Sequence, residues 1–231
     1  MISVLTCTGD RPVCFKLLEK WMNAQTVKPD QWVVIDDGKV PAVPTVDCLY
    51  IRREPKADDP PQTLNVNMRH ALPFLECDKL IIWEDDEYYA PNYIEIMSKK
   101  LDLSEVVGIC KSKYYHLPAS TYYVHPNIDH ASLAQTAMTD AFYKVYLEKL
   151  IEENPFMDLR IWKQAFTNNN ALLFHDGNEN CLYVGMKGLV GRKGIGSGHR
   201  GLGNKDINHR ILKQWIPLDY KHYLNQELVR R

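Results

Sequence analysis

The chain has 231 residues, of which 45% are hydrophobic and 25% are charged, and its formal net charge is -1. These values are typical of one folded domain and exclude a disordered or membrane-embedded chain. The near-neutral charge gives no global reason to invoke nucleic acid as a partner.

No targeting or membrane segment is expected, because residues 1–5 run directly into an apparent strand and no apolar run approaches the length of a membrane span. The six cysteines are scattered without a Cys-x-x-Cys pair, so we interpret them as reduced thiols rather than as a disulfide framework or zinc site. Together these features predict a cytoplasmic protein. The cysteines are Cys7, Cys14, Cys48, Cys77, Cys110 and Cys181.

Strand-like and helix-like stretches alternate through the first half of the chain. The patterns predict a strand at 2–6, a helix after Pro12, strands at 32–35 and 48–51, a helix at 64–75, a strand at 80–83 and a helix from Pro91 to about Lys100. Residues 54–61 (EPKADDPP) are predicted to form a loop. This alternation predicts an α/β fold with a mostly parallel sheet flanked by helices.

The second half is less regular. A strand is predicted at 106–110 and helices at 137–152 and 158–166, whereas the Tyr- and His-rich residues 114–130 receive no assignment. Residues 185–203 contain eight glycines, which predicts a glycine-rich C-terminal loop rather than a rigid element. A loop of this kind beside a crevice commonly closes over ligands.

Four consecutive carboxylates, residues 84–87, follow the apolar strand predicted at 80–83. Like charges repel one another unless a cation lies among them, and hard divalent cations such as magnesium or manganese prefer oxygen ligands. A solvated turn is the alternative for an isolated acidic run. A second apolar strand ends in Asp36 and Asp37, and carboxylates at the carboxyl ends of two strands are the layout of a ligand crevice in an open α/β sheet.

Four segments, taken in order, resemble the family 2 glycosyltransferases of the GT-A fold. They are residues 6–12 (TCTGDRP), 32–38 (WVVIDDG), 67–70 (NMRH) and 82–93 (IWEDDEYYAPNY). The family has an early Thr with Arg-Pro, a strand ending in Asp-Asp-Gly, an Arg before a helix, and an acidic DXD-type motif followed by an aromatic residue and Pro. Here the acidic run begins with Glu84 rather than Asp, which leaves open which two carboxylates face the metal.

The resemblance implies a Rossmann-like GT-A catalytic domain over residues 1–231, with a nucleotide-sugar-binding half at 1–100 and an acceptor-binding half with the C-terminal loop at 101–231. It also implies an inverting transfer of a hexosyl or pentosyl group from a nucleotide sugar, with a UDP-sugar as the favoured donor and Mn²⁺ or Mg²⁺ as the cofactor. The ion would neutralise the charge that develops on the leaving nucleoside diphosphate.

Residue roles follow from the matched segments. Asp86 is the candidate metal ligand and Asp85 faces the metal and donor beside it, with Glu84 and Glu87 as supporting charges. The donor-binding candidates of the first segment are Thr6, Thr8 and Arg11.

By resemblance, Asp36 would contact the nucleotide base or ribose together with Asp37, and Arg69 would lie near the donor. The alternative for the two aspartates is a turn before Gly38, since Asp-Gly is a common turn pair. The alternative for Arg69 is a surface salt bridge.

In the second half, residues 157–163 (MDLRIWK) resemble the family pattern that carries the catalytic base, so Asp158 is the candidate base. Its alternative is a carboxylate that the dipole favours at a helix N-terminus. His199 is a candidate metal or diphosphate ligand, because some GT-A enzymes add a C-terminal His to the metal. Four basic residues of the same loop are expected to clamp phosphate oxygens, unless they form only an exposed basic loop. They are Lys187, Arg192, Lys193 and Arg200.

From residue 187 to 231 there are ten Lys or Arg against three acidic residues. A basic end is consistent with a polyanionic acceptor, although part of the excess would serve the donor diphosphate. The small size also resembles phage-encoded glycosyltransferases, some of which modify hydroxymethylated pyrimidines in DNA, and such a protein would act in the host cytoplasm. A surface glycan or small molecule is the alternative acceptor.

Two other classes stay open. A nucleotidyltransferase would be expected to have a glycine-rich basic signature near the first strand, where this chain has only Gly9, Asp10 and Arg11. The other is a non-catalytic carbohydrate-binding module.

Overall fold

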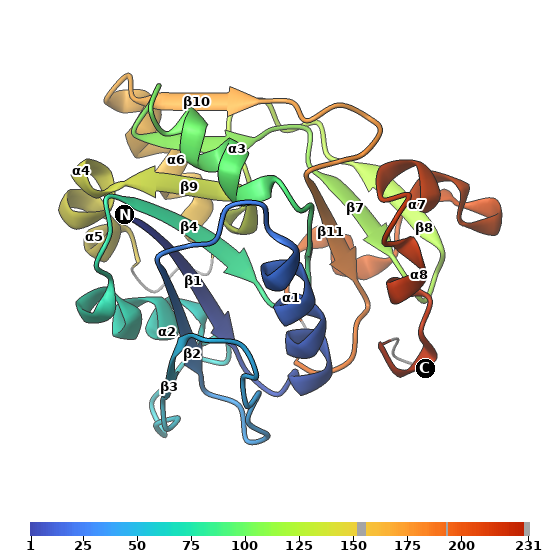
Figure 1. Cartoon of the computed structure of the whole chain (residues 1–231), viewed down its shortest axis with the longest axis horizontal. Helices are drawn as coiled ribbons and strands as arrows, with labels where there is room; N and C mark the ends of the chain where they lie inside the picture. The colour runs from blue at the N-terminus through green and yellow to red at the C-terminus, as the bar shows by residue number, and fades with distance from the viewer. Residues whose placement is uncertain (152–155, 193, 229–231) are drawn as a thin grey trace.

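The computed structural model, which describes residues 1–151, 156–192 and 194–228, contains a seven-stranded and a five-stranded sheet (Figure 1). In the larger sheet every strand runs parallel to its neighbours except β9, which is antiparallel to β4 and β6. From edge to edge its strands are β10 (Ala171–Phe174), β6 (Val106–Ile109), β9 (Thr136–Thr139), β4 (Lys79–Glu84), β1 (Ile2–Thr8), β2 (Gln31–Asp36) and β3 (Leu49–Arg52). This arrangement confirms the predicted α/β fold with a mostly parallel sheet.

Helices cover both faces of the larger sheet. Alternate residues of a strand point to opposite sides, so the apolar side chains on each face pack against a different set of helices. Val4 of β1 packs with Phe15 of α1, while the next residue, Leu5, packs in a separate cluster with Met68 of α2. The helices α1 and α3 belong to the first cluster, and α2 and α6 to the second. The described helices are α1 (Pro12–Ala24), α2 (Leu64–Ala71), α3 (Tyr93–Lys100), α4 (Asp140–Phe142), α5 (Glu148–Leu150), α6 (Met157–Thr167), α7 (Arg210–Trp215) and α8 (Tyr220–Tyr223), with a π-helical turn at Tyr143–Leu147 between α4 and α5.

The smaller sheet joins the second half of the chain to the end of β4. Its strands, in spatial order, are β12 (Asn204–Lys205), β8 (Thr121–Val124), β7 (Lys113–His116), β11 (Tyr183–Lys187) and β5 (Tyr88–Tyr89). β5 directly follows the acidic residues 84–87 and pairs antiparallel with β11, with Tyr89 opposite Tyr183. Lys187, at the end of β11, is thereby brought next to these residues.

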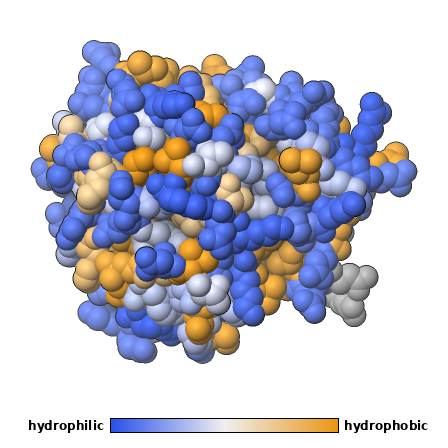
Figure 2. Space-filling view, in the orientation of Figure 1, coloured by the Kyte–Doolittle hydropathy of each residue, from blue (hydrophilic) through white to orange (hydrophobic). Residues whose placement is uncertain are grey.

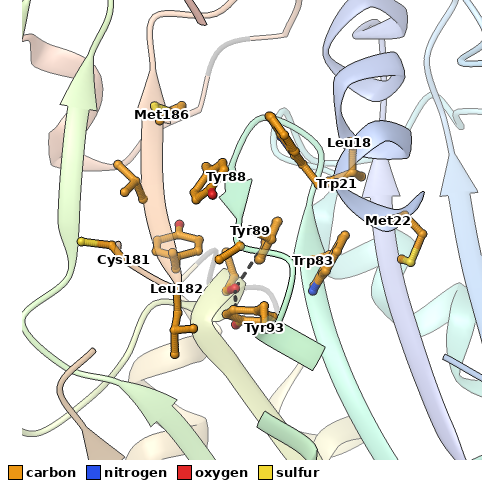
Figure 3. Packing of buried hydrophobic residues seen from close by; sticks show 14 of the residues in the cluster. Leu18, Trp21, Met22, Trp83, Tyr88, Tyr89, Tyr93, Cys181, Leu182 and Met186 are labelled. Carbon is orange, nitrogen blue, oxygen red and sulfur yellow. Dashed lines mark hydrogen bonds between the residues drawn. The ribbon is translucent and has the colours of Figure 1, made fainter. Parts of the chain in front are cut away.

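A buried aromatic cluster supports residues 84–87 from behind (Figure 3). The rings of Trp83 and Tyr89 are stacked with centroids 4.2 Å apart, and Tyr93 meets both rings edge-on. The hydroxyl of Tyr89 accepts a hydrogen bond from the backbone N–H of Glu84 at 2.8 Å. The position of the acidic residues therefore depends on core packing and not on their own charges alone.

Two predictions of local structure need correction, and one unassigned stretch receives a structure. The helix predicted at 137–152 begins only at Asp140, because residues 136–139 form β9 and fill the gap between β4 and β6. Gly185, predicted to lie in a loop, belongs to β11, where a side chain would collide with the ring of Tyr114. The unassigned stretch 114–130 contains most of β7 and all of β8.

The surface in view is mostly hydrophilic, with hydrophobic residues scattered in small groups (Figure 2). Within the described residues, no helix combines the length and the apolar character that crossing a bilayer requires. All six cysteines are free thiols, which agrees with the interpretation of their spacing.

Candidate functional site

A cleft of about 360 Å³ opens where β1, β2 and β4 end together. The parallel register places Thr8 opposite Asp36 and Cys7 opposite Glu84, so polar residues from three strands meet at one edge of the sheet. Both halves of the chain line the cleft, as expected for a ligand crevice at the carboxyl ends of parallel strands. Its charged and histidine lining residues are Arg11, Glu84, Asp85, Asp86, Glu87, His125, His130, Asp158, Lys187, Arg192 and His199.

The acidic turn, residues 84–87, is held by two cationic side chains. Nη1 of Arg11 lies 2.7 Å from Oδ1 of Asp85 and 2.9 Å from Oδ2 of Asp86. The ammonium group of Lys187 pairs with Glu87, whose side chain is buried. Four carboxylates thus face two cations.

The pKa values of the turn reflect this imbalance. Burial, followed by repulsion from the charge of Glu87, raises the pKa of Glu84 to about 8. Burial also raises the pKa of Glu87 to about 7, against the attraction of Lys187. Burial works to raise the pKa of Asp86 too, but Arg11 and Lys187 outweigh it and hold that pKa below its usual value. A further cation at the turn would therefore be electrostatically favoured.

Three of the four carboxylates converge. One side-chain oxygen each from Glu84, Asp86 and Glu87 lies within 4.8 Å of the others, and among the described residues this is the group that could hold a metal ion. Asp85 lies outside the group, because its carboxylate accepts from the Thr8 hydroxyl at 2.5 Å and pairs with Arg11. The three oxygen donors fit a hard divalent cation.

His199 lines the same cleft without being part of the carboxylate group. Burial and the nearby Lys187 lower its pKa to about 4, although Asp86 opposes the shift. Its imidazole is therefore neutral, which is the form that binds metals or accepts hydrogen bonds.

Two residues of the donor-binding prediction are enclosed in the fold. Thr6 is fully buried, and its hydroxyl accepts a hydrogen bond from Nε1 of Trp32 at 3.0 Å. Asp36 is also fully buried and accepts from the backbone N–H groups of Gly38 and Ala42 at 2.8 Å each. Tyr50 and Arg52 complete its set of partners at 2.7 and 2.8 Å. Asp36 thus shapes the loop after β2.

Arg192 reaches from the glycine-rich segment to the end of β2. Its Nη1 lies 2.9 Å from Oδ1 of Asp37 and donates to Thr63 at 2.8 Å. Its carbonyl oxygen accepts from Nε of Arg11 at 2.8 Å. The structure therefore brings together Asp37, Arg11 and Arg192, which are far apart in the sequence.

The remaining basic candidates lie elsewhere. Arg69 is exposed and donates to the carbonyl of Ile151, the residue directly after α5, at 2.6 Å. Arg200 is exposed, and neither arginine is among the described residues that line the cleft. Lys193 lies outside the described residues.

Asp158 stands in the first turn of α6 and lines the cleft. Its Oδ1 accepts from the backbone N–H of Leu159 at 3.0 Å, which fixes the carboxylate near the helix N-terminus. Burial raises its pKa above the usual value for an aspartate. A carboxylate with a raised pKa is a stronger base once ionised.

The sequence motifs do not reveal a polar wall of the cleft, which is formed by the residue just before β7 and by the loop between β8 and β9. It includes Ser112, His125, Asn127, His130 and Ser132. The available signal was the density of Tyr and His in residues 114–130, but no local pattern showed that this stretch turns toward the cleft.

No protein-family model and no curated protein sequence matches the chain. Solved structures do match it. TarS of S. aureus superposes with a TM-score of 0.60 at 16% identity, covering 80% of this chain and 36% of that chain. TarS 1-349 in complex with UDP-GlcNAc superposes with a TM-score of 0.59 at 14% identity, covering 87% of this chain and 61% of that chain. The chain has the GT-A fold.

A third match is the mannosyltransferase PcManGT of Pyrobaculum calidifontis in complex with GDP-Man and Mn²⁺, with a TM-score of 0.59, 10% identity and coverage of 79% and 56%. The chain spans between 36% and 61% of the length of these three proteins. At these identities the likeness concerns the GT-A fold itself, and activity must be argued from the cleft.

Proposed function

We propose that the chain is a glycosyltransferase that moves a sugar from a nucleoside diphosphate sugar to an acceptor hydroxyl, with Mn²⁺ or Mg²⁺ at the acidic turn. The composition of that turn carries the proposal, because its four carboxylates, once all are ionised, exceed the positive charges of Arg11 and Lys187 by two. One divalent cation held by the group Glu84, Asp86 and Glu87 would balance this excess. When bound, the cation would neutralise charge that develops on the departing diphosphate. The Mn²⁺ and GDP-Man in a protein of the same fold support this assignment.

The donor would lie along the ends of β1 and β4, with Thr8 and Asp37 near the nucleotide. Arg11, Lys187 and Arg192 line the cleft and would bind phosphate oxygens, since guanidinium and ammonium groups form charge-assisted hydrogen bonds with phosphate. We propose a UDP-sugar first, because TarS 1-349 has been solved with UDP and with UDP-GlcNAc. Residues 1–100 would then mainly bind the donor and residues 101–231 the acceptor, with β11 and Arg192 as the second half's contribution to the donor side.

Asp158 is the proposed base. It would take the proton of the acceptor hydroxyl while the oxygen attacks the anomeric carbon and the bond to the diphosphate breaks. A single displacement of this kind inverts the anomeric configuration. The position of Asp158 in the cleft and its raised pKa support the role.

A modified-DNA acceptor rests on the excess of basic residues from residue 187 onward. Two of them are already paired, Lys187 with Glu87 and Arg192 with Asp37. Both lie at the donor side of the cleft, which weakens the electrostatic argument for DNA.

The test is incubation of the protein with UDP-, GDP-, CDP- and TDP-sugars and Mn²⁺. The proposal predicts slow release of a nucleoside diphosphate from one donor and none in EDTA. Pyrophosphate release would instead indicate a nucleotidyltransferase, and binding without turnover of any donor would indicate a carbohydrate-binding module.

A further inference from the structure

The loop between β8 and β9 brings two histidines into the part of the cleft that Asp158 lines. The rings of His125 and His130 both line the cleft, with centroids 5.9 Å apart and planes at 72°. Neither belongs to the carboxylate group of the acidic turn. His130 also lies near the carboxylate of Asp158.

The hydrogen bond at Nδ1 determines whether Nε2 of each neutral ring is a hydrogen-bond donor or an acceptor. The backbone N–H of Asn127 donates to Nδ1 of His125 at 3.1 Å, so the neutral ring carries its proton on Nε2. Nδ1 of His130 lies 2.7 Å from Oδ1 of Asp129, which can only accept, so Nδ1 carries the proton and Nε2 of the neutral ring has a lone pair. The two rings therefore offer one donor and one acceptor.

Buried Asn127 holds this loop in place. Its Nδ2 donates to the carbonyl of His130 at 2.5 Å, and its Oδ1 accepts from the backbone N–H of Ser112 at 3.0 Å. Only 5% of Asn127 is exposed. The histidine pair is thus arranged before any ligand arrives, which lowers the entropic cost of binding.

We propose that His125 and His130 bind the acceptor and that this acceptor is a neutral saccharide. A sugar hydroxyl both donates and accepts, so neighbouring hydroxyls can engage the donor Nε2 and the acceptor Nε2 together. Phe156 and Leu159, 46% and 50% exposed, line the same cleft and offer apolar surface to the C–H face of a sugar ring. This inference rests on the proposed transferase function.

The charges of the cleft favour a neutral acceptor over an anionic one. The arginine and lysine side chains among the described lining residues are the ones proposed to bind the donor diphosphate. Each also pairs with a carboxylate that lies at or after the end of β2 or β4: Arg11 with Asp85 and Asp86, Lys187 with Glu87, and Arg192 with Asp37. The histidine pair adds polar groups but no fixed positive charge.

The test separates acceptor binding from donor chemistry. Two assays are run on the wild type and on four variants: His125→Phe, His130→Phe and the conservative His125→Gln and His130→Gln. The first measures donor hydrolysis without acceptor. The second measures transfer to methyl glycosides of glucose, galactose, mannose and N-acetylglucosamine. His175→Phe is the matched control, since His175 also accepts a backbone N–H at Nδ1, from Gly177, but is exposed and outside the described cleft lining. The imidazole ¹⁵N resonances of the wild type are followed as the glycosides are added.

We expect each Phe variant to raise the acceptor KM about three- to tenfold, the loss of one net hydrogen bond, and to change donor hydrolysis by a smaller factor, and we expect Gln to restore part of the loss. The glycosides should shift the resonances of both imidazoles. The inference would be overturned if the Phe variants kept the wild-type acceptor KM or lost donor hydrolysis and transfer equally. It would also be overturned if the glycosides shifted neither imidazole resonance while hydroxymethylated DNA accepted the sugar. Absence of donor hydrolysis and transfer in the wild type would instead overturn the proposed function on which it rests.

Discussion

Asp86 is the residue of the acidic turn whose carboxylate meets Arg11 and also converges with Glu84 and Glu87. Asp86→Asn should remove most of the transfer activity and weaken Mn²⁺ binding while leaving the fold intact, because an amide keeps the shape of the carboxylate but not its charge. Calorimetric titration with Mn²⁺ and a transfer assay measure the two effects. Asp47→Asn, at an exposed aspartate, is the control. Wild-type Mn²⁺ affinity together with full activity in Asp86→Asn would remove Asp86 from the metal site.

Asp158 is predicted to act on the rate and not on donor affinity. Asp158→Asn should lower kcat by on the order of a hundredfold or more, the range typical of lost general-base catalysis, with donor affinity nearly unchanged. Steady-state kinetics with varied donor distinguish the two. A variant whose only defect is weaker donor binding would exclude the base role.

The raised pKa of Asp158 also predicts an effect on stability. The folded state holds this proton more tightly than the unfolded state, so stability falls as pH rises from the usual pKa of Asp through the raised one. Asp158→Asn, which cannot ionise, should therefore unfold at a slightly higher temperature than wild type at pH 7, and the difference should shrink toward pH 3. Thermal unfolding followed by circular dichroism checks this. A lower midpoint for the variant at pH 7 would contradict it.

For single residues, the sequence predicted that the acidic turn, Asp158, Arg11 and Arg192 belong to the site, but it did not predict the direction of each side chain. Asp85 and Asp86 are adjacent in the sequence, yet only Asp86 joins the converging oxygens, because Thr8 holds Asp85. Asp36 matched the donor-binding pattern, but its four partners come from the loop after β2 and from β3, which no local pattern reveals.

At the scale of elements, the glycine-rich segment depends on one close approach to the loop after β1. Gly191 has φ of +97°, and a Cβ there would lie 2.4 Å from Cγ of Arg11. Gly191→Ala should destabilise the protein by about 1 kcal/mol or more and weaken donor binding, since both Arg11 and Arg192 would be displaced. Denaturant unfolding and titration with UDP measure these effects.

Gly196→Ala is the matched control, because Gly196 has φ of -60° and its added Cβ would meet no atom of the described residues closer than 4.0 Å. It should leave stability and UDP binding nearly unchanged. Equal effects of the two substitutions would show that the close approach at Gly191 is unimportant.

The elements with a strong local period were predictable, and those that depend on tertiary pairing were not. The helix from Pro12 carries apolar residues at helical spacing, and β2 and β4 each contain a continuous apolar run. β9 is only four residues long and precedes a helical pattern, so its pairing with β4 and β6 decides its state. The loop with His125 and His130 is held by hydrogen bonds of the Asn127 side chain. These bonds could not be predicted, because the residues that form them follow no periodic pattern in the sequence.

For the whole molecule, the central claim is that a bound divalent cation and Asp158 together make the cleft an inverting glycosyltransferase site. The most direct measurement is proton NMR of the anomeric signals while the protein turns over a donor sugar with Mg²⁺. We expect the first sugar product to have the anomeric configuration opposite to that of the donor and its formation to stop in EDTA. A product of retained configuration, or an unchanged rate in EDTA, would contradict it.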